Sequence, residues 1–237
     1  MNEKLIEKIK ERGYWRVNFQ PLIATIKMDT LQKCKDVVER NSVQLRGWDY
    51  PHIPRRNDEN SGMAPAGNYY EGWENWANHK EFWRIYKSGQ FLYYRGLRED
   101  WLEEDDWRPK VAEKIKPGSS LGVVGSVIYE ITETFSFLSR LATAGLYDEG
   151  VNVKISLNKT KDRELWIEDP MRASFMYPRK TSALNLSFEE AYTKDEIINN
   201  SKGLANKLIL QIFDSFGFNP PPEQIEKDQD VLLSGKA

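Results

Sequence analysis

Segments with strand periodicity and segments with helix periodicity alternate along the whole chain, and this pattern most restricts the folds that the chain can adopt. Residues 14–19 alternate with a period of two, which is typical of a strand. After Gly125, apolar residues recur every three or four positions as far as about residue 145, which indicates an amphipathic helix. We therefore predict an α/β or α+β fold in which helices pack on a mixed sheet.

The same reasoning assigns most of the remaining chain. Helices are predicted over residues 2–12, 29–40 and 76–87, and from Thr193, where Glu196 completes a capping box, to about residue 216. Strands are predicted over residues 42–50, 69–75, 90–97, 151–157, 165–167 and 183–188, with 151–157 and 165–167 joined as a hairpin. Residues 51–68 contain three prolines and two glycines among many polar residues, so we predict a long loop there.

A boundary is predicted between about residues 105 and 120, where an acidic run is followed by Pro109 and Pro117. It divides the chain into an N-terminal α/β half over residues 1–110 and a C-terminal α/β half over residues 111–222, followed by a mobile tail over residues 223–237. In each half a helix precedes three strands in the same order. This order is compatible with two diverged α-β-β-β copies.

The composition excludes several classes of protein. Lys and Arg total 34 against 36 Asp and Glu, so the chain is not a strongly basic, non-specific DNA-binding protein. Cys34 is the only cysteine, which excludes an internal disulfide and a cysteine-based zinc site. The first residues are charged and no apolar run reaches about 18 residues, so we expect no signal peptide, no membrane span and a cytoplasmic location.

Residues 45–56, LRGWDYPHIPRR, form the most distinctive segment of the chain. Arginine suits phosphate or carboxylate groups, tryptophan and tyrosine offer flat stacking surfaces, and Gly47 allows close approach of a partner. The candidate ligand-binding residues of this segment are Arg46, Trp48, Asp49, Tyr50, His52, Arg55 and Arg56. The alternative is that the aromatic rings belong to the core and the arginines face solvent. Asp49 and His52 could also form a general base, although no nucleophile is evident nearby.

The helix predicted over residues 76–87 would place Lys80 and Arg84 on one face and aromatic rings, including Trp83, on another. Interleaved aromatic and basic side chains are typical of proteins that bind single-stranded nucleic acid, so these three residues join the candidate ligand-binding set. An amphipathic helix with an apolar core side and a solvated basic side has the same pattern, and this alternative stays open.

Two other segments could bind small ions. The acidic run over residues 99–106 could hold a hard cation, although such runs are more often solvated surface. Residues 118–125, GSSLGVVG, precede a helix and could hold an anion on backbone amides, or could be only a flexible start of that helix. The chain contains neither a P-loop motif nor an HExxH motif. We therefore predict no cofactor, no metal ligand and no catalytic residue.

Two segments, LRGWDYPHI at residues 45–53 and EFWRIYKSGQF at residues 81–91, resemble a group of uncharacterised bacterial proteins. Some of these proteins occur beside Schlafen AlbA-type nucleic-acid-binding domains. The resemblance covers about residues 40–100 and implies a link to nucleotides or nucleic acids. It carries no established catalytic residue.

These features predict a non-enzymatic recognition or sensor module. Its ligand would be anionic and planar, either a nucleotide or a short single-stranded nucleic acid. One alternative is a protein–protein interaction module, in which the aromatic residues form core or a partner surface. Another is a metal-dependent hydrolase or nuclease that uses the acidic run.

Overall fold

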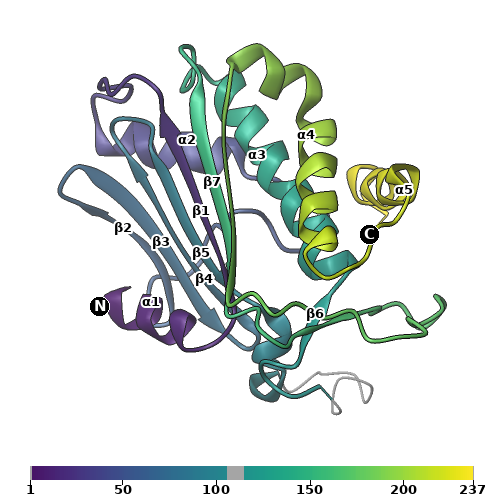
Figure 1. The fold of residues 1–237 in the computed structure, drawn as a ribbon. Helices are drawn as coiled ribbons and strands as arrows, with labels where there is room; N and C mark the ends of the chain where they lie inside the picture. The colour runs from purple at the N-terminus through teal and green to yellow at the C-terminus, as the bar shows by residue number, and fades with distance from the viewer. Residues whose placement is uncertain (1, 106–114, 237) are drawn as a thin grey trace.

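One antiparallel sheet of seven strands runs through the protein, with strand order β2-β3-β4-β5-β1-β7-β9 (Figure 1). The computed structural model describes residues 2–105 and 115–236. The strands of this sheet are β1 (Tyr14–Pro21), β2 (Ser61–Ala66), β3 (Tyr69–Trp76), β4 (His79–Tyr86), β5 (Phe91–Gly96), β7 (Val151–Asn158) and β9 (Asn185–Tyr192). A separate parallel pair is formed by β6 (Ser120–Gly122) and β8 (Glu164–Trp166). The predicted class, an α+β fold with helices packed on a sheet, is confirmed, and the large sheet is antiparallel throughout rather than mixed.

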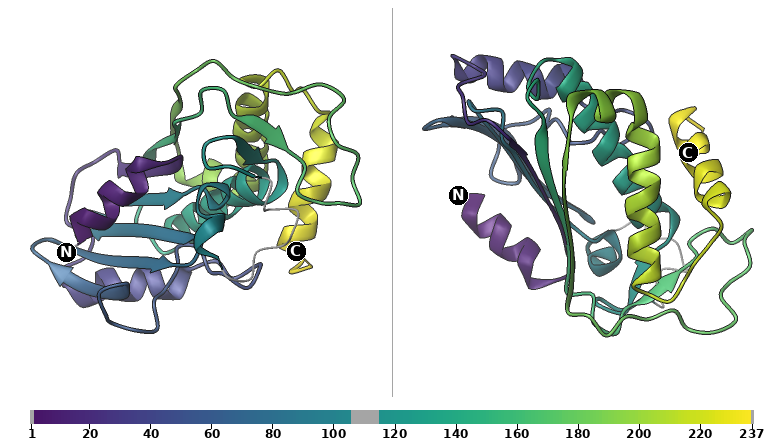
Figure 2. Two further views of the ribbon diagram at one scale, coloured as in Figure 1. Left: turned by 90° about the horizontal axis from the view of Figure 1, so that it is seen from below. Right: turned by 45° about the horizontal axis from the view of Figure 1, so that its top comes forward.

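The helices cover the two faces of the sheet unequally (Figure 2). Helix α1 (Asn2–Glu11) lies on one face, where Ile6 and Ile9 pack against Trp73 and Phe82. The opposite face carries the main core, under α2 (Leu31–Asn41), α3 (Glu130–Thr143) and α4 (Lys194–Asp214). Helix α5 (Pro222–Leu233) packs outside α4, and a π-helical turn (Val124–Tyr129) leads into α3. Of the helices described, none is both long and apolar enough to span a bilayer.

Several local predictions are confirmed because their signals lie within the element itself. The Thr193 side chain accepts a hydrogen bond from the backbone N–H of Glu196, and the Glu196 carboxylate accepts one from the Thr193 N–H. The capping box therefore starts α4 as predicted. Helices α1, α2 and α3 and strands β1, β3 and β5 also occupy their predicted segments. Each begins or ends at a cap, glycine or proline that is visible in the sequence.

The prediction of a helix over residues 76–87 is wrong, because residues 79–86 form strand β4. Ala77 adopts a φ of +46° in a two-residue turn, which reverses the chain so that Trp76 lies opposite His79. Strand β4 then pairs along its whole length with β3. Aromatic rings fit the pleated, half-buried surface of a sheet well. The pairing with β3 therefore decided the structure of this segment, although its aromatic residues also recur at a helical spacing.

Three further predictions are corrected by the sheet. Residues 42–50 form no strand and are closed only by a bridge between Val43 and Tyr50, while β2 lies within the predicted loop over 51–68. The predicted hairpin is absent, because β7 pairs with β1 and β9 whereas β8 pairs with β6. Alternation reveals which side chains share a face of a strand, but it does not select the neighbouring strand.

Strands from both predicted halves pair within the one sheet, since β1 lies between β5 and β7. The predicted boundary includes residues 106–114, which lie outside the described residues. Helix α2 is followed by four strands of the sheet, whereas α3 is followed by only two, β7 and β9. The segment predicted as a mobile tail contains α5, in which Ile225 and Leu232 are buried.

Candidate functional site

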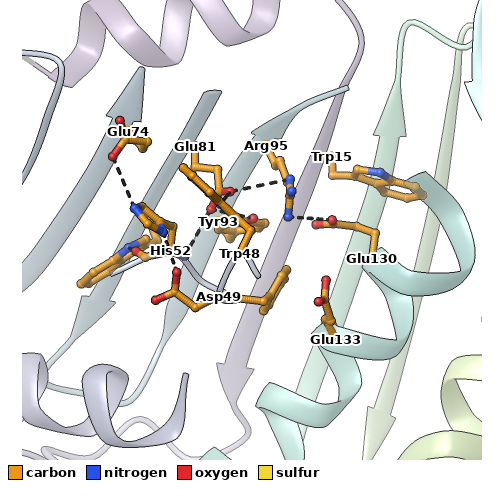
Figure 3. Close-up of polar contacts among 12 residues, drawn as sticks. Trp15, Trp48, Asp49, His52, Glu74, Glu81, Tyr93, Arg95, Glu130 and Glu133 are labelled. Carbon is orange, nitrogen blue, oxygen red and sulfur yellow. Dashed lines mark hydrogen bonds and ion pairs between the residues drawn. The ribbon is translucent and has the colours of Figure 1, made fainter. Parts of the chain in front are cut away.

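A row of polar side chains crosses the core face of the sheet (Figure 3). The row consists of residues that lie opposite one another on five neighbouring strands: Ser61, Glu74, Glu81, Arg95 and Trp15. Residues that are paired in this way point to the same face of a sheet. Glu81 is only 1% exposed and Arg95 only 5% exposed. Because buried charges are costly unless they are paired, this row requires a specific set of partners.

Glu81 anchors the segment over residues 44–56 to the sheet. The Trp48 indole N–H donates to Glu81 Oε1 over 2.6 Å, and the backbone N–H of His52 donates to Oε2 over 3.3 Å. The Tyr93 hydroxyl donates to the same Oε2 over 3.1 Å. In return, the Trp83 indole donates to the carbonyl of His52 over 2.9 Å. The loop is therefore held on the sheet by partly buried hydrogen bonds to Glu81 and from Trp83.

His52 is held by a carboxylate at each ring nitrogen (Figure 3). Its Nδ1 is 2.6 Å from Asp49 Oδ1, and its Nε2 is 3.4 Å from Glu74 Oε2. Burial by itself would lower the pKa of His52, but its bonds to Asp49 and Glu74 and the charge of Glu81 raise the pKa to about 9. The ring is therefore an imidazolium at neutral pH, with no free nitrogen to act as a general base.

Trp48 stacks on both histidines of the chain. Its ring lies 4.0 Å from that of His52 and 3.8 Å from that of His79, and it is nearly parallel to both. Burial lowers the pKa of His79 to about 2, so this second imidazole is neutral. Trp76, half of which is exposed, is nearly parallel to Trp48 at 6.2 Å. The cluster therefore places a cation against an extended aromatic surface.

Arg46, which was predicted to bind a ligand, is bound by the protein itself. Its guanidinium lies 2.7 Å from Glu133 and 3.5 Å from Glu130, both on α3, and it also donates to the carbonyl of Gly125. Arg95 lies 2.9 Å from Glu130 and 3.7 Å from Glu81. Burial raises the pKa of Glu130 to about 7, against the opposing charges of Arg95 and Arg46. This network joins α3 to the sheet.

The other predicted site residues separate into three groups. Tyr50 and Trp83 are buried in the main core. Lys80 and Arg84 lie on the opposite face of β4 from Glu81, where they are 2.8 Å from Glu104 and 2.7 Å from Glu71 respectively. Arg55 and Arg56 are exposed, and their side chains form no hydrogen bond or ion pair with the other described residues.

A cavity of about 490 Å³ opens beside the stacked rings. It brings together Trp48, Asp49, His52 and Arg55 from the predicted set, next to Gly47. Gly47 has a φ of +75° and open space around its Cα. This volume lies within the range of small-molecule sites.

Acidic residues of the run over 99–106 form ion pairs with basic residues elsewhere in the protein. Glu104 pairs with Lys8 and Lys80, Glu103 pairs with Arg12, and Asp100 pairs with Arg163. Asp106 lies outside the described residues. Across residues 2–105 and 115–236, no three His, Cys, Asp or Glu side chains converge as potential metal ligands.

The glycine-rich segment before α3 uses its amides within the chain. The backbone N–H groups of Val124 and Gly125 donate to the Glu168 carboxylate over 2.9 Å and 2.8 Å. The N–H of Gly122 donates to Glu99, and that of Gly118 donates to Asp100. These amides therefore already bind carboxylates, which are the chain's own anions.

Glu74, Glu81, Arg95, Glu130 and Glu133 were missed by the sequence analysis. For three of them a signal existed, because Glu74, Glu81 and Arg95 occur within runs of aromatic residues that form buried strands. A charged residue in such a run must find a buried partner. That signal could be used only after residues 79–86 were assigned to a strand rather than to a helix.

The raised pKa of His52 leads to a pH prediction. The pKa of His52 is the ordinary 6.5 in the unfolded chain and about 9 in the folded chain. The protonated ring therefore contributes stability that is complete below about pH 6.5 and is lost as the pH rises through 9. We expect the free energy of unfolding to fall by about 3 kcal/mol over this range, as measured by urea unfolding.

The only other histidine of the chain supplies the matched control. The His52→Gln variant should lose most of this pH dependence. The His79→Gln variant should keep it, because His79 is neutral in both states above about pH 7.5. Parallel pH profiles for the wild-type chain and His52→Gln would contradict the assignment.

Comparison with known proteins gives no assignment for this chain: no family model matches it, and neither the curated proteins nor the solved structures include a significant match.

Proposed function

We propose that the protein is a non-enzymatic recognition or sensor module that binds a planar anionic ligand, a nucleotide or a short single-stranded nucleic acid. The cavity of about 490 Å³ beside Trp48 carries this proposal. It combines an aromatic cluster, the imidazolium of His52 and the guanidinium of Arg55. Stacking surfaces next to positive charge are the combination that such ligands require.

The charge around the cavity favours a small ligand. Asp49 and Glu74 compensate the charge of His52, so Arg55 and Arg56 supply the positive charge that remains. Because the side chains of Arg55 and Arg56 pair with no other described residue, they suit one or two phosphate groups better than a long nucleic acid. A net charge of −2 for the chain agrees with this, because long nucleic acids are bound mainly through many cations.

A recognition role, rather than a catalytic one, is supported by the state of His52. Both of its ring nitrogens face carboxylates, and a pKa of about 9 keeps the ring protonated at neutral pH. Trp76 supports binding of a short single strand, because its half-exposed ring extends the aromatic surface beyond Trp48. A second base could stack there.

The test is a tryptophan-fluorescence titration with AMP and with a ten-nucleotide oligothymidine, at about 50 mM and 200 mM salt. We expect saturable quenching. The Arg55→Ala/Arg56→Ala double variant should bind the oligonucleotide roughly tenfold more weakly, and its log–log salt slope should be smaller by about 1.4. Both effects follow from the loss of two phosphate contacts.

Arg40→Ala is the matched control, because the Arg40 side chain is 80% exposed and lies on α2. This variant should bind as the wild-type chain does. Equal affinity and salt slope for the double variant and the control would contradict the proposal. The absence of saturable quenching with both probes would also contradict it.

A second function, protein–protein interaction, is favoured by the segment between β8 and β9, which extends from the body of the protein (Figure 1). This segment exposes Met171, Met176 and Tyr177, with Met171 91% exposed. Large apolar side chains that are exposed within one short segment can form an interaction surface. Ligand-free self-association that does not weaken with salt would favour this function over nucleotide recognition.

A further inference from the structure

A second cavity, of about 400 Å³, lies beside the start of α3, and it shares no lining residue with the cavity beside Trp48. The side chains of Glu99 and Glu168 line it, together with the rings of Tyr129 and Trp166. We propose that this cavity binds the base of a guanine nucleoside or nucleotide. The proposal goes beyond the function proposed above and uses none of its residues.

The two carboxylates converge on one point. Both lie against Gly122, where an added Cβ would be 2.1 Å from Glu168 Oε1 and 2.7 Å from Glu99 Oε1. Backbone N–H groups hold both of them in place: Gly122 donates to Glu99, while Val124 and Gly125 donate to Glu168. Both carboxylates are therefore held in fixed positions in residues that line the cavity.

One oxygen of this pair has no partner among the residues that the structure describes. Glu99 is 3% exposed, and its Oε2 is buried without a hydrogen bond among the described residues. A buried carboxylate oxygen that lacks a donor is unfavourable, and an ionised carboxylate can only accept. Because Glu99 lines the cavity, a ligand with an N–H donor could supply the partner that the protein does not.

The remaining walls select a flat ligand. The rings of Tyr129 and Trp166 and the apolar side chain of Leu102 line the cavity. Arg172 also lines it but is paired with Asp169 and Asp228. The guanidinium of Arg98 forms no ion pair or hydrogen bond with the other described residues, so it is available for the ribose or phosphate of a nucleotide.

Guanine fits two neighbouring acceptors because its N1–H and N2 amino group are adjacent donors. Adenine presents a donor next to an acceptor at the corresponding edge, and the acceptor would face a carboxylate. Inosine keeps N1–H but lacks the N2 amino group. A site built around hydrogen bonds discriminates strongly against an analogue that leaves one of its buried groups unpaired.

The experiment is a calorimetric titration of the full chain with guanosine, inosine and adenosine at pH 7.5. We expect guanosine to bind roughly tenfold or more tightly than inosine or adenosine. The Glu99→Gln variant keeps the shape of the side chain and an acceptor for Gly122, and it should weaken guanosine binding roughly tenfold. Glu164→Gln, in β8 but outside the cavity, should bind guanosine as the wild-type chain does.

Trp76→Ala, which removes the half-exposed ring of the aromatic cluster beside Trp48, separates the two cavities, because guanosine binding should be unchanged in that variant. Equal affinities for guanosine and inosine, or no detectable guanosine binding, would overturn the proposal. The nucleoside comparison uses the wild-type chain, so it decides the question even if Glu99→Gln fails to fold. An unchanged affinity in a folded Glu99→Gln variant would also overturn it.

Discussion

Replacing Asp100 with alanine is expected to lower the free energy of unfolding by about 3–5 kcal/mol. Asp100 is fully buried, and Arg163, whose guanidinium binds it through two nitrogens, is 1% exposed. Asp100 also accepts from the backbone N–H groups of Gly13 and Gly118 over 2.7 Å each. The substitution would leave a buried guanidinium and two amides without their acceptor.

Urea unfolding followed by tryptophan fluorescence measures this loss. The Asp195→Ala variant, which changes an exposed residue in the first turn of α4, should stay within about 0.5 kcal/mol of the wild-type chain. Arg163→Met should cost nearly as much as Asp100→Ala, and the double variant should cost less than the sum of the two. A loss below about 1 kcal/mol for Asp100→Ala would show that the pair contributes little.

The second large effect is expected for Arg95→Met, which should also cost about 3–5 kcal/mol at neutral pH. Arg95 is the cation between Glu81 and Glu130 on the core face of the sheet. Burial already raises the pKa of Glu130 to about 7, and Arg95 is the main charge that opposes this rise. Without Arg95, the pKa of Glu130 should rise further.

The rise in the pKa of Glu130 makes the stability loss of Arg95→Met depend on pH, and the direction of this dependence can be stated. A carboxyl group whose pKa is raised by folding destabilises the protein at pH values above its ordinary pKa, so Arg95→Met should be more harmful at pH 8 than at pH 5.5. Adding Glu130→Gln should restore part of the stability at pH 8. Arg16→Met, on the opposite face of β1 from Trp15, is the control and should cost less than about 1 kcal/mol. Equal defects at both pH values would contradict this account.

The buried network also holds in place the segment that lines the cavity beside Trp48. Glu81 accepts hydrogen bonds from Trp48 and from the backbone of His52, and Trp83 donates to the His52 carbonyl. The segment that carries Trp48 and Arg55 is therefore fixed on the sheet, which would favour the binding proposed above. Such preorganisation lowers the entropic cost of binding.

Part of the candidate site could be predicted from the sequence. Trp48, Asp49, His52 and Arg55 are close in sequence, and they line one cavity. The role of Arg46 could not be predicted, because its partner Glu133 lies 87 residues away. Lys80 and Arg84 were placed near the site by a helical spacing, but in strand β4 they lie on the opposite face from Glu81.

The sequence by itself determined the elements whose signals are local: the helices α1 to α4, the strands β1, β3, β5 and β7, and the aromatic and basic segment over residues 45–56. Only the tertiary structure decided that residues 79–86 are a strand and that Glu74, Glu81 and Arg95 form one row on three strands. Periodicity and caps act within a few residues, so they are visible in the sequence. Strand partners and buried ion pairs join residues far apart in the chain, and only packing of the whole chain selects them.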